Sequence, residues 1–169
     1  PEAAAGAPEA EVRRAGPGRR LVAGQLWILN VLSLSLLCGA YGAAADPATL
    51  RGWLFLEAGR LSCAATLSLV PGLLVLALAG LVASRRALAL AAGLLWTLAH
   101  LAVYVDTLIY SLFRYHFNGL VWNVLTTPGA DEAVSFSRSD VTGVGLGLGL
   151  LLALDVVAFT VLWRWSVGR

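Results

Sequence analysis

The sequence has little charge, and this shortage argues against a water-soluble globular fold. Of its 169 residues only 13% are charged, whereas 59% are hydrophobic. Soluble domains carry about 25% charged residues. The twelve basic residues are all arginine, with no lysine, and they cluster at the ends of apolar runs. We therefore predict an integral membrane protein, and we expect no nucleic-acid partner because no basic face exists outside those flanks.

The chain also lacks the residue clusters that metal binding and catalysis require. Its two cysteines, Cys38 and Cys63, lie inside apolar segments, with no CxxC spacing and no histidine nearby in sequence. We expect them to be buried small hydrophobes, with a disulfide as the alternative, and we expect no metal site. No set of serine, histidine and aspartate and no pair of carboxylates at hydrolase spacing is visible. The sequence therefore predicts a non-enzyme without a cofactor.

Four long apolar segments predict an all-α integral membrane fold, a polytopic bundle of four transmembrane helices. A helix needs about 20 apolar residues to cross a bilayer. The expected helices cover about residues 21–45, 53–83, 87–113 and 141–165. Pro71-Gly72 predicts a kink within the second of these helices. Residues 114–124 are expected to form an interfacial segment on the periplasmic side, and residues 125–140 a polar periplasmic loop.

The charged ends of the apolar segments predict how the chain is oriented. Residues 1–20 have no apolar face to bury, and we expect a disordered cytoplasmic tail there, before a transmembrane domain over residues 21–169. Eight arginines flank one side of the expected bundle and four the other. This asymmetry favours both termini in the cytoplasm, so we expect a multi-pass protein of the bacterial inner membrane, with residues 106–123 on the outer face.

Residues 106–123 gather most of the informative polar and aromatic side chains. On continuous helical geometry Asp106 and Phe117 would share one face. Tyrosine and tryptophan prefer the boundary between lipid and water, so the stretch marks a membrane surface. Two interpretations stay open, an aromatic collar that fixes helix depth and a site that grips a lipid headgroup. We expect Asp106 to cap nearby backbone or to pair with an arginine. The candidate interface residues are Asp106, Tyr110, Arg114, His116, Asn118 and Trp122.

Three polar residues fall deep within the expected spans, where ionisable groups are costly. Asn30 and Asp155 lie at similar depths from the same side, so we expect them to be neighbours joined by a packing hydrogen bond. A proton path is the alternative. His100 is expected to be neutral and bonded to a neighbouring helix, with a proton carrier or a metal ligand as the alternative. A repeat of small residues in the last span predicts a surface where another helix backbone approaches closely, at Gly143, Gly145, Gly147 and Gly149.

The stretch around residues 106–123 resembles the N-terminal membrane domain of the PbgA/YejM family. These are bacterial inner-membrane proteins with a periplasmic sulfatase-like domain of the alkaline phosphatase superfamily. The resemblance covers roughly residues 24–165. Arg114 and Gly119 differ from the histidine and proline of the best-known member. The matching residues are Asp106, Ile109, Tyr110, Phe113, His116, Asn118, Val121 and Trp122, followed by Pro128.

The resemblance implies a membrane-anchoring domain that serves envelope lipid homeostasis. Such relatives are implied to sense lipopolysaccharide, with cardiolipin as another ligand, and to act through an adaptor membrane protein. The family's C-terminal periplasmic domain is not part of these 169 residues, so we expect no enzymatic activity from them. One alternative is the membrane half of a phosphoethanolamine- or glycerophosphate-type lipid-modifying transferase or hydrolase. Another is a small proton-coupled transporter that uses His100 and Asp155.

Overall fold

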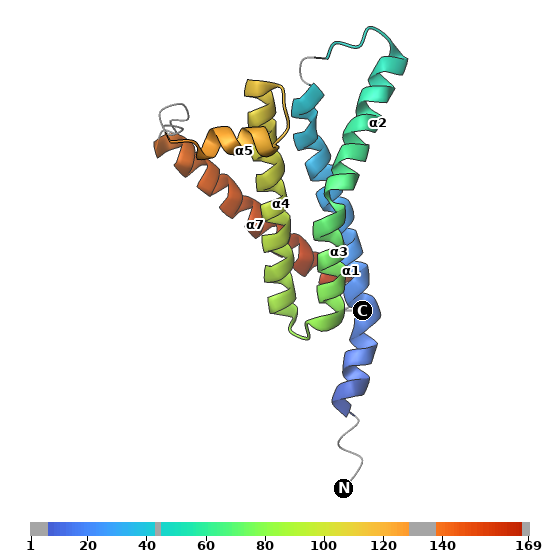
Figure 1. The fold of residues 1–169 in the computed structure, drawn as a ribbon. Coiled ribbons are helices and arrows are strands. Elements are labelled where there is room, and N and C mark those ends of the chain that lie inside the picture. The colour runs from blue at the N-terminus through green and yellow to red at the C-terminus, as the bar shows by residue number, and fades with distance from the viewer. Residues whose placement is uncertain (1–6, 43–44, 129–137, 167–169) are drawn as a thin grey trace.

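The computed structural model describes residues 7–42, 45–128 and 138–166, and the elements in these residues are helices (Figure 1). No strand occurs in the described part of the chain, which confirms the all-α prediction. The elements are α1 (Ala7–Cys38), the 3-10 helix η2 (Gly39–Gly42), α2 (Leu50–Leu67), α3 (Leu69–Leu81), α4 (Arg85–Phe113), α5 (Gly119–Thr126) and α7 (Arg138–Ser166).

Three segments are long and apolar enough to cross a membrane: Gly18–Gly42, Arg85–Ser111 and Thr142–Ser166. The pair α2 and α3 is bent by 44° and makes a fourth if it counts as one span. Large apolar side chains cover the outside of these helices; Leu146 and Leu150 expose 72% and 63% of their surface. Water-soluble monomers rarely expose apolar surface on this scale. The helices therefore fit a membrane-embedded protein.

The first helix begins earlier than the sequence suggests. We expected residues 1–20 to be disordered, but α1 starts at Ala7, and residues 1–6 lie outside the described residues. Alanine has the highest helix propensity, and it recurs at positions 7, 10 and 15. The expected loop over residues 125–140 falls largely on residues 129–137, which also lie outside the described residues.

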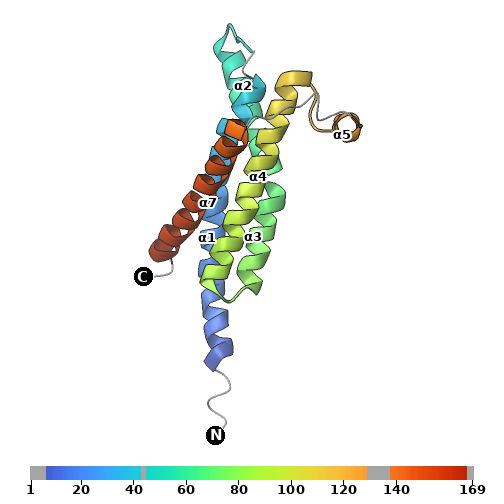
Figure 2. The same cartoon turned by 90° about the vertical axis from the view of Figure 1, so that its left-hand side faces the viewer.

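α1 is the central element of the bundle. It contacts α2, α3, α4 and α7 (Figures 1 and 2). The core lies along these contacts, and its largest fully buried side chains come from three helices: Leu26 and Leu34 from α1, Trp96 from α4 and Phe159 from α7. A shared core of this kind fixes the other helices relative to α1.

The expected kink in the second span occurs at Ser68, three residues before Pro71. Proline has no N–H to donate and its ring clashes with the carbonyl four residues earlier, which here belongs to Leu67. The helix therefore breaks before the proline. The indole of Trp27 fits against this break, because its Nε1 donates to Oγ of Ser68 at 2.8 Å and its ring lies against Gly72.

Two arginines join helices at the end of the bundle that carries both chain termini. Nη1 of Arg19 donates to the carbonyl of Val82 at 3.0 Å, and Nη2 of Arg85 lies 3.4 Å from the carbonyl of Thr160. Both guanidinium groups also lie over the ring of Trp163, at 5.9 and 5.5 Å from its centre. Arg19 and Arg85 therefore pack against the bundle through both hydrogen bonds and cation–π contacts.

Gly72→Val should destabilise the bundle. A β-carbon at Gly72 would meet the indole of Trp27, so the larger side chain must displace that ring and break its hydrogen bond to Ser68. Overpacking of this kind costs roughly 1–3 kcal/mol. Thermal unfolding in mild detergent should show a lower Tm. The control is Gly59→Ala, because a β-carbon there meets nothing within 4 Å. An equal Tm for the two variants would contradict the packing of Trp27.

Candidate functional site

Asp106, near the end of α4, joins three parts of the chain. Its Oδ2 accepts a hydrogen bond from the hydroxyl of Tyr41 at 2.6 Å and lies 2.7 Å from Nδ1 of His116, which donates to it. Its Oδ1 accepts the backbone N–H of Phe117 at 2.6 Å. Hydrogen bonds to an ionised acceptor are stronger than neutral ones. The carboxylate therefore holds η2, α4 and the following turn together.

Three aromatic rings pack around this carboxylate. The ring centres of Tyr41, Tyr110 and His116 lie 5.0 to 5.4 Å from one another. Two of the contacts are edge-to-face, and the rings of Tyr110 and His116 are stacked. Such pairs are stabilising beyond the area they bury. The cluster thus fixes the side-chain positions around Asp106, and the arginines expected as partners are not among its hydrogen-bonding groups.

The chain turns back immediately after α4. Arg114 has the left-handed conformation, with φ of 58°, and its N–H donates to the carbonyl of Tyr110 at 2.9 Å. Left-handed residues commonly end helices. The expectation that Asp106 and Phe117 share a face of one continuous helix is therefore wrong, because the helix stops at Phe113. The turn brings the two residues together through the backbone of Phe117 instead.

Asn118 begins the short helix α5 and caps it. Its Oδ1 accepts the backbone N–H groups of Leu120 at 3.0 Å and Val121 at 3.1 Å. This is the usual role of asparagine at a helix N-terminus. Trp122 follows on α5, with 57% of its surface exposed, and its ring centre lies 6.3 Å from that of Phe117. The indole of Trp122 is thus presented outward by the capped turn.

The candidate interface residues therefore divide into two groups. Asp106, His116 and Asn118 hold the turn in place through hydrogen bonds within the chain, and the ring of Tyr110 supports it by stacking on His116. Arg114 lies over the ring of Tyr110, 6.0 Å from its centre, and has no carboxylate at salt-bridge distance among the described residues. Arg114 and Trp122 remain as the side chains of this set that are best placed to meet a ligand or a membrane surface.

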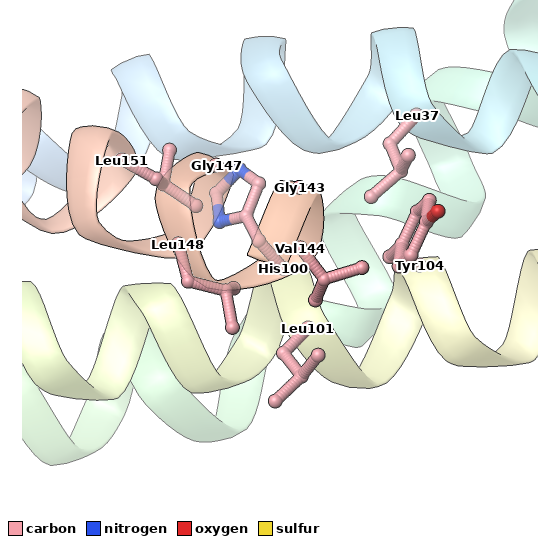
Figure 3. Close-up of a pocket in the computed structure, with 9 residues that line it drawn as sticks. All are labelled: Leu37, His100, Leu101, Tyr104, Gly143, Val144, Gly147, Leu148 and Leu151. Carbon is pink, nitrogen blue, oxygen red and sulfur yellow. The ribbon is translucent and has the colours of Figure 1, made fainter. Parts of the chain in front are cut away.

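A cleft of about 400 Å³ lies between α1, α4 and α7 (Figure 3). Its lining is almost wholly apolar, with the imidazole of His100 and the phenol of Tyr104 as the polar groups. Volumes of about 300–1,000 Å³ are typical of pockets that bind small molecules. The lining residues are Leu37, His100, Leu101, Tyr104, Gly143, Val144, Gly147, Leu148 and Leu151.

The cleft exists because α4 and α7 pack tightly at one level and separate at another (Figure 1). At Gly93 of α4 a β-carbon would come within 2.9 Å of Leu152 and 3.1 Å of Val156, so the glycine permits the close contact. Toward the other end of α7, Gly143 and Gly147 have no side chains with which to fill the gap.

The repeated glycines of α7 form no close helix contact in the described part of the chain. A β-carbon at Gly143, Gly145, Gly147 or Gly149 would meet nothing within 4 Å. Gly143 and Gly147 line the cleft, whereas Gly145 and Gly149 do not. Gly93, in contrast, brings α4 and α7 together, and the small-residue repeat does not reveal it.

The comparisons assign the chain to a family. A model described as a domain of unknown function (DUF3413) matches residues 20–168. The chain belongs to the DUF3413 family. The match covers all the apolar helices and is compatible with an N-terminal domain of PbgA/YejM-like proteins. No curated protein and no solved structure matches this DUF3413 domain.

The DUF3413 domain brings its buried polar residues into contact across helices. Nδ2 of Asn30 donates to Oδ1 of Asp155 at 3.1 Å, in accord with the depth expected for both residues. The other carboxylate oxygen, Oδ2, is buried without a hydrogen-bond partner among the described residues. Burying a polar atom in this way is costly. The hydrogen bond from Asn30 therefore offsets part of the cost of burying this carboxyl group.

His100 is hydrogen-bonded on both ring nitrogens. Nδ1 lies 2.8 Å from the carbonyl of Trp96, which can only accept, so this nitrogen carries a proton. Nε2 lies 2.7 Å from the hydroxyl of Ser33 on α1. The ring of His100 therefore joins α4 to α1. Ser33 and Tyr41 are hydrogen-bonding partners of His100 and Asp106 that sequence reasoning missed, because nothing in the sequence marks these two hydroxyl groups.

Asp106→Ala should release the turn after α4. The change removes the acceptor of the Phe117 N–H and of two side chains, so local opening should become easier. Hydrogen bonds to charged groups contribute roughly 1.5–3 kcal/mol, which corresponds to about 10- to 150-fold faster exchange. Hydrogen–deuterium exchange of peptides that contain Phe117 measures the effect. Tyr41→Phe is the control, since it keeps that acceptor. Unchanged exchange in Asp106→Ala would refute the role of the carboxylate.

The contact between Asn30 and Asp155 should behave as a coupled pair. Asn30→Leu alone leaves the buried carboxyl group without its donor and should cost roughly 1.5–3 kcal/mol. Adding Asp155→Leu should recover part of this loss, because replacing both polar partners by apolar ones is often nearly neutral. Equilibrium unfolding of both single variants and the double variant measures the coupling energy. Additive losses would show that the two side chains do not interact.

Proposed function

We propose that this DUF3413 domain is the membrane anchor of a larger inner-membrane protein and that it binds a lipid acyl chain in the cleft between α4 and α7. The cleft is the observation that carries the proposal. In a bilayer its apolar walls face hydrocarbon, so the chemically matched occupant is a fatty acyl chain. Its volume of about 400 Å³ suits part of one lipid molecule.

The proposed arrangement has four spans, with the bent pair α2 and α3 crossing once. Arginine-rich flanks, including Arg19 and Arg85, lie at the cytoplasmic end, which agrees with the preference of arginine for that side. The end that carries Asp106 then faces the periplasm. α5 lies there as an interfacial helix, and its exposed Trp122 rests at the headgroup level.

The outer turn supplies groups suited to an anionic lipid surface. Arg114 lies over Tyr110, with no carboxylate at salt-bridge distance among the described residues, and basic side chains near a membrane attract anionic headgroups. The rigid turn built on Asp106 fixes where that charge is presented. In this proposal the aromatic side chains fix the depth of the helix end in the membrane, and Arg114 attracts the anionic headgroups.

The biological role that we propose is envelope lipid homeostasis. It rests on the resemblance to the PbgA/YejM family, with lipopolysaccharide or cardiolipin as the lipid class. A periplasmic sulfatase-like domain would follow this anchor in the whole protein. An adaptor membrane protein would bind through a transmembrane helix, for which Gly145 and Gly149, which lie outside the cleft, offer a close approach.

Gly147→Leu should reduce lipid binding in the cleft. Gly147 lines the cleft, and a leucine there occupies space that an acyl chain would fill. The matched control is Gly149→Leu, because this residue is on the same helix, is equally uncrowded and lies outside the cleft.

The measurement is photocrosslinking in nanodiscs with a phospholipid that carries a diazirine on its acyl chain. We expect severalfold less labelling of α4 and α7 peptides in Gly147→Leu than in the wild type, with little change in Gly149→Leu. Equal labelling of all three proteins at these peptides would contradict the proposal.

A further inference from the structure

The sequence contains two cysteines, and the structure places them in contact. Sγ of Cys38 lies 3.9 Å from Sγ of Cys63, although the residues are 25 positions apart. Cys38 is at the end of α1 with 1% of its surface exposed, and Cys63 is half-buried on α2. Neither is in a disulfide. The two helices already pack against each other, and the sulfurs must approach by about 2 Å to reach bonding distance.

The two cysteines lie toward the end of the bundle that carries Asp106, near a polar pair on α2. Nε of Arg60 donates to the carbonyl of Ser35 on α1 at 3.1 Å, and its Nη1 pairs with Glu57 at 2.9 Å. The side chain of Glu57 is 47% exposed. Cys63 follows Arg60 by three residues, which is about 4.5 Å along a helix. A reagent in the aqueous layer at the level of this ion pair is therefore about one helical turn from the less buried sulfur.

We propose that Cys38 and Cys63 form a reversible dithiol–disulfide couple that links α1 to α2. The oxidant is a water-soluble disulfide or a thiol oxidase in its disulfide form. The Cys63 thiolate attacks this disulfide, which forms a mixed disulfide and releases one thiol of the oxidant. The Cys38 thiolate then attacks the Cys63 sulfur and releases the second thiol. The two cysteines lose two protons and two electrons, and the disulfide of the oxidant becomes a dithiol.

The short helix η2 connects Cys38 to the candidate site around Asp106. Cys38 is the last residue of α1, and Tyr41, three residues later, donates to Asp106. A covalent link between α1 and α2 at this level therefore restrains the segment that positions the outer turn. This inference goes beyond lipid binding, and it does not require the cleft to be occupied.

The test uses membranes that contain the full-length protein. One sample is equilibrated with oxidised glutathione and another with reduced glutathione, and both are quenched with acid and treated with N-ethylmaleimide. Peptide mapping by mass spectrometry without reductant should find the Cys38 and Cys63 peptides joined in the oxidised sample, two hydrogens lighter than their sum. In the reduced sample both peptides should carry the alkylating group. Alkylated or glutathione-bound peptides in the oxidised sample, or links between two copies of the chain, would overturn the proposal.

A matched variant keeps the test independent of folding. In the double variant Ser62→Cys/Cys63→Ser a thiol stands one position away, on an exposed part of α2, and the link to Cys38 should be strongly reduced. Equal linking of this variant counts against a specific pair. Access is then compared in spheroplasts and in inverted vesicles. Linking in inverted vesicles alone would refute the proposed orientation of the bundle while leaving the couple intact.

Discussion

In a hydrocarbon environment each buried polar group must find its partner within the protein, and this requirement organises the bundle around α1. α1 and its continuation η2 provide one side of most of the polar contacts between helices. The contacts are Arg19 to Val82, Gln25 to Ser166, Trp27 to Ser68, Asn30 to Asp155, Ser33 to His100, Ser35 to Arg60 and Tyr41 to Asp106. Because these contacts occur at successive levels, α1 fixes both the rotation and the depth of its neighbours.

The cleft follows from the same arrangement. α1 holds α4 through Ser33 and α7 through Asn30, and Gly93 lets α4 and α7 meet closely at one level. The two helices then separate, and the glycines of α7 leave the space between them open. Apolar packing alone would favour filling this space, since voids forfeit dispersion contacts. In a bilayer, lipid acyl chains can fill the cleft. The polar groups around Asp106 already bond to one another, so the cleft is the better candidate for lipid binding.

Much of the fold is visible in the sequence because span length and apolar composition depend on the bilayer and not on tertiary detail. The helices around residues 87–113 and 141–165 lie close to their expected positions, and the similar depths of Asn30 and Asp155 indicate their contact. Depth can be counted along a chain because each helical residue adds a fixed rise. The start of α1 cannot be obtained in this way, since alanine-rich polar sequence is compatible with either helix or coil.

The candidate site is less predictable, because it depends on contacts between distant residues. α4 ends close to its expected boundary, but the left-handed Arg114 also turns the chain back, so Asp106 and Phe117 do not share a helical face. Tyr41 reaches Asp106 from another helix, and Gly93 stands alone in its span. These features are fixed by helix packing, which a single sequence records only indirectly.

The central claim is that α1 forms the interior of a membrane-embedded bundle whose α7 faces lipid. Single cysteines at Leu26 on α1 and Leu150 on α7, in a background with Cys38 and Cys63 replaced by serine, test it most directly. A lipid-dissolved maleimide should label the cysteine at position 150 and spare that at position 26, and a water-soluble maleimide should label neither. Labelling of position 26 as strong as that of position 150, or labelling of position 150 from water, would contradict the account.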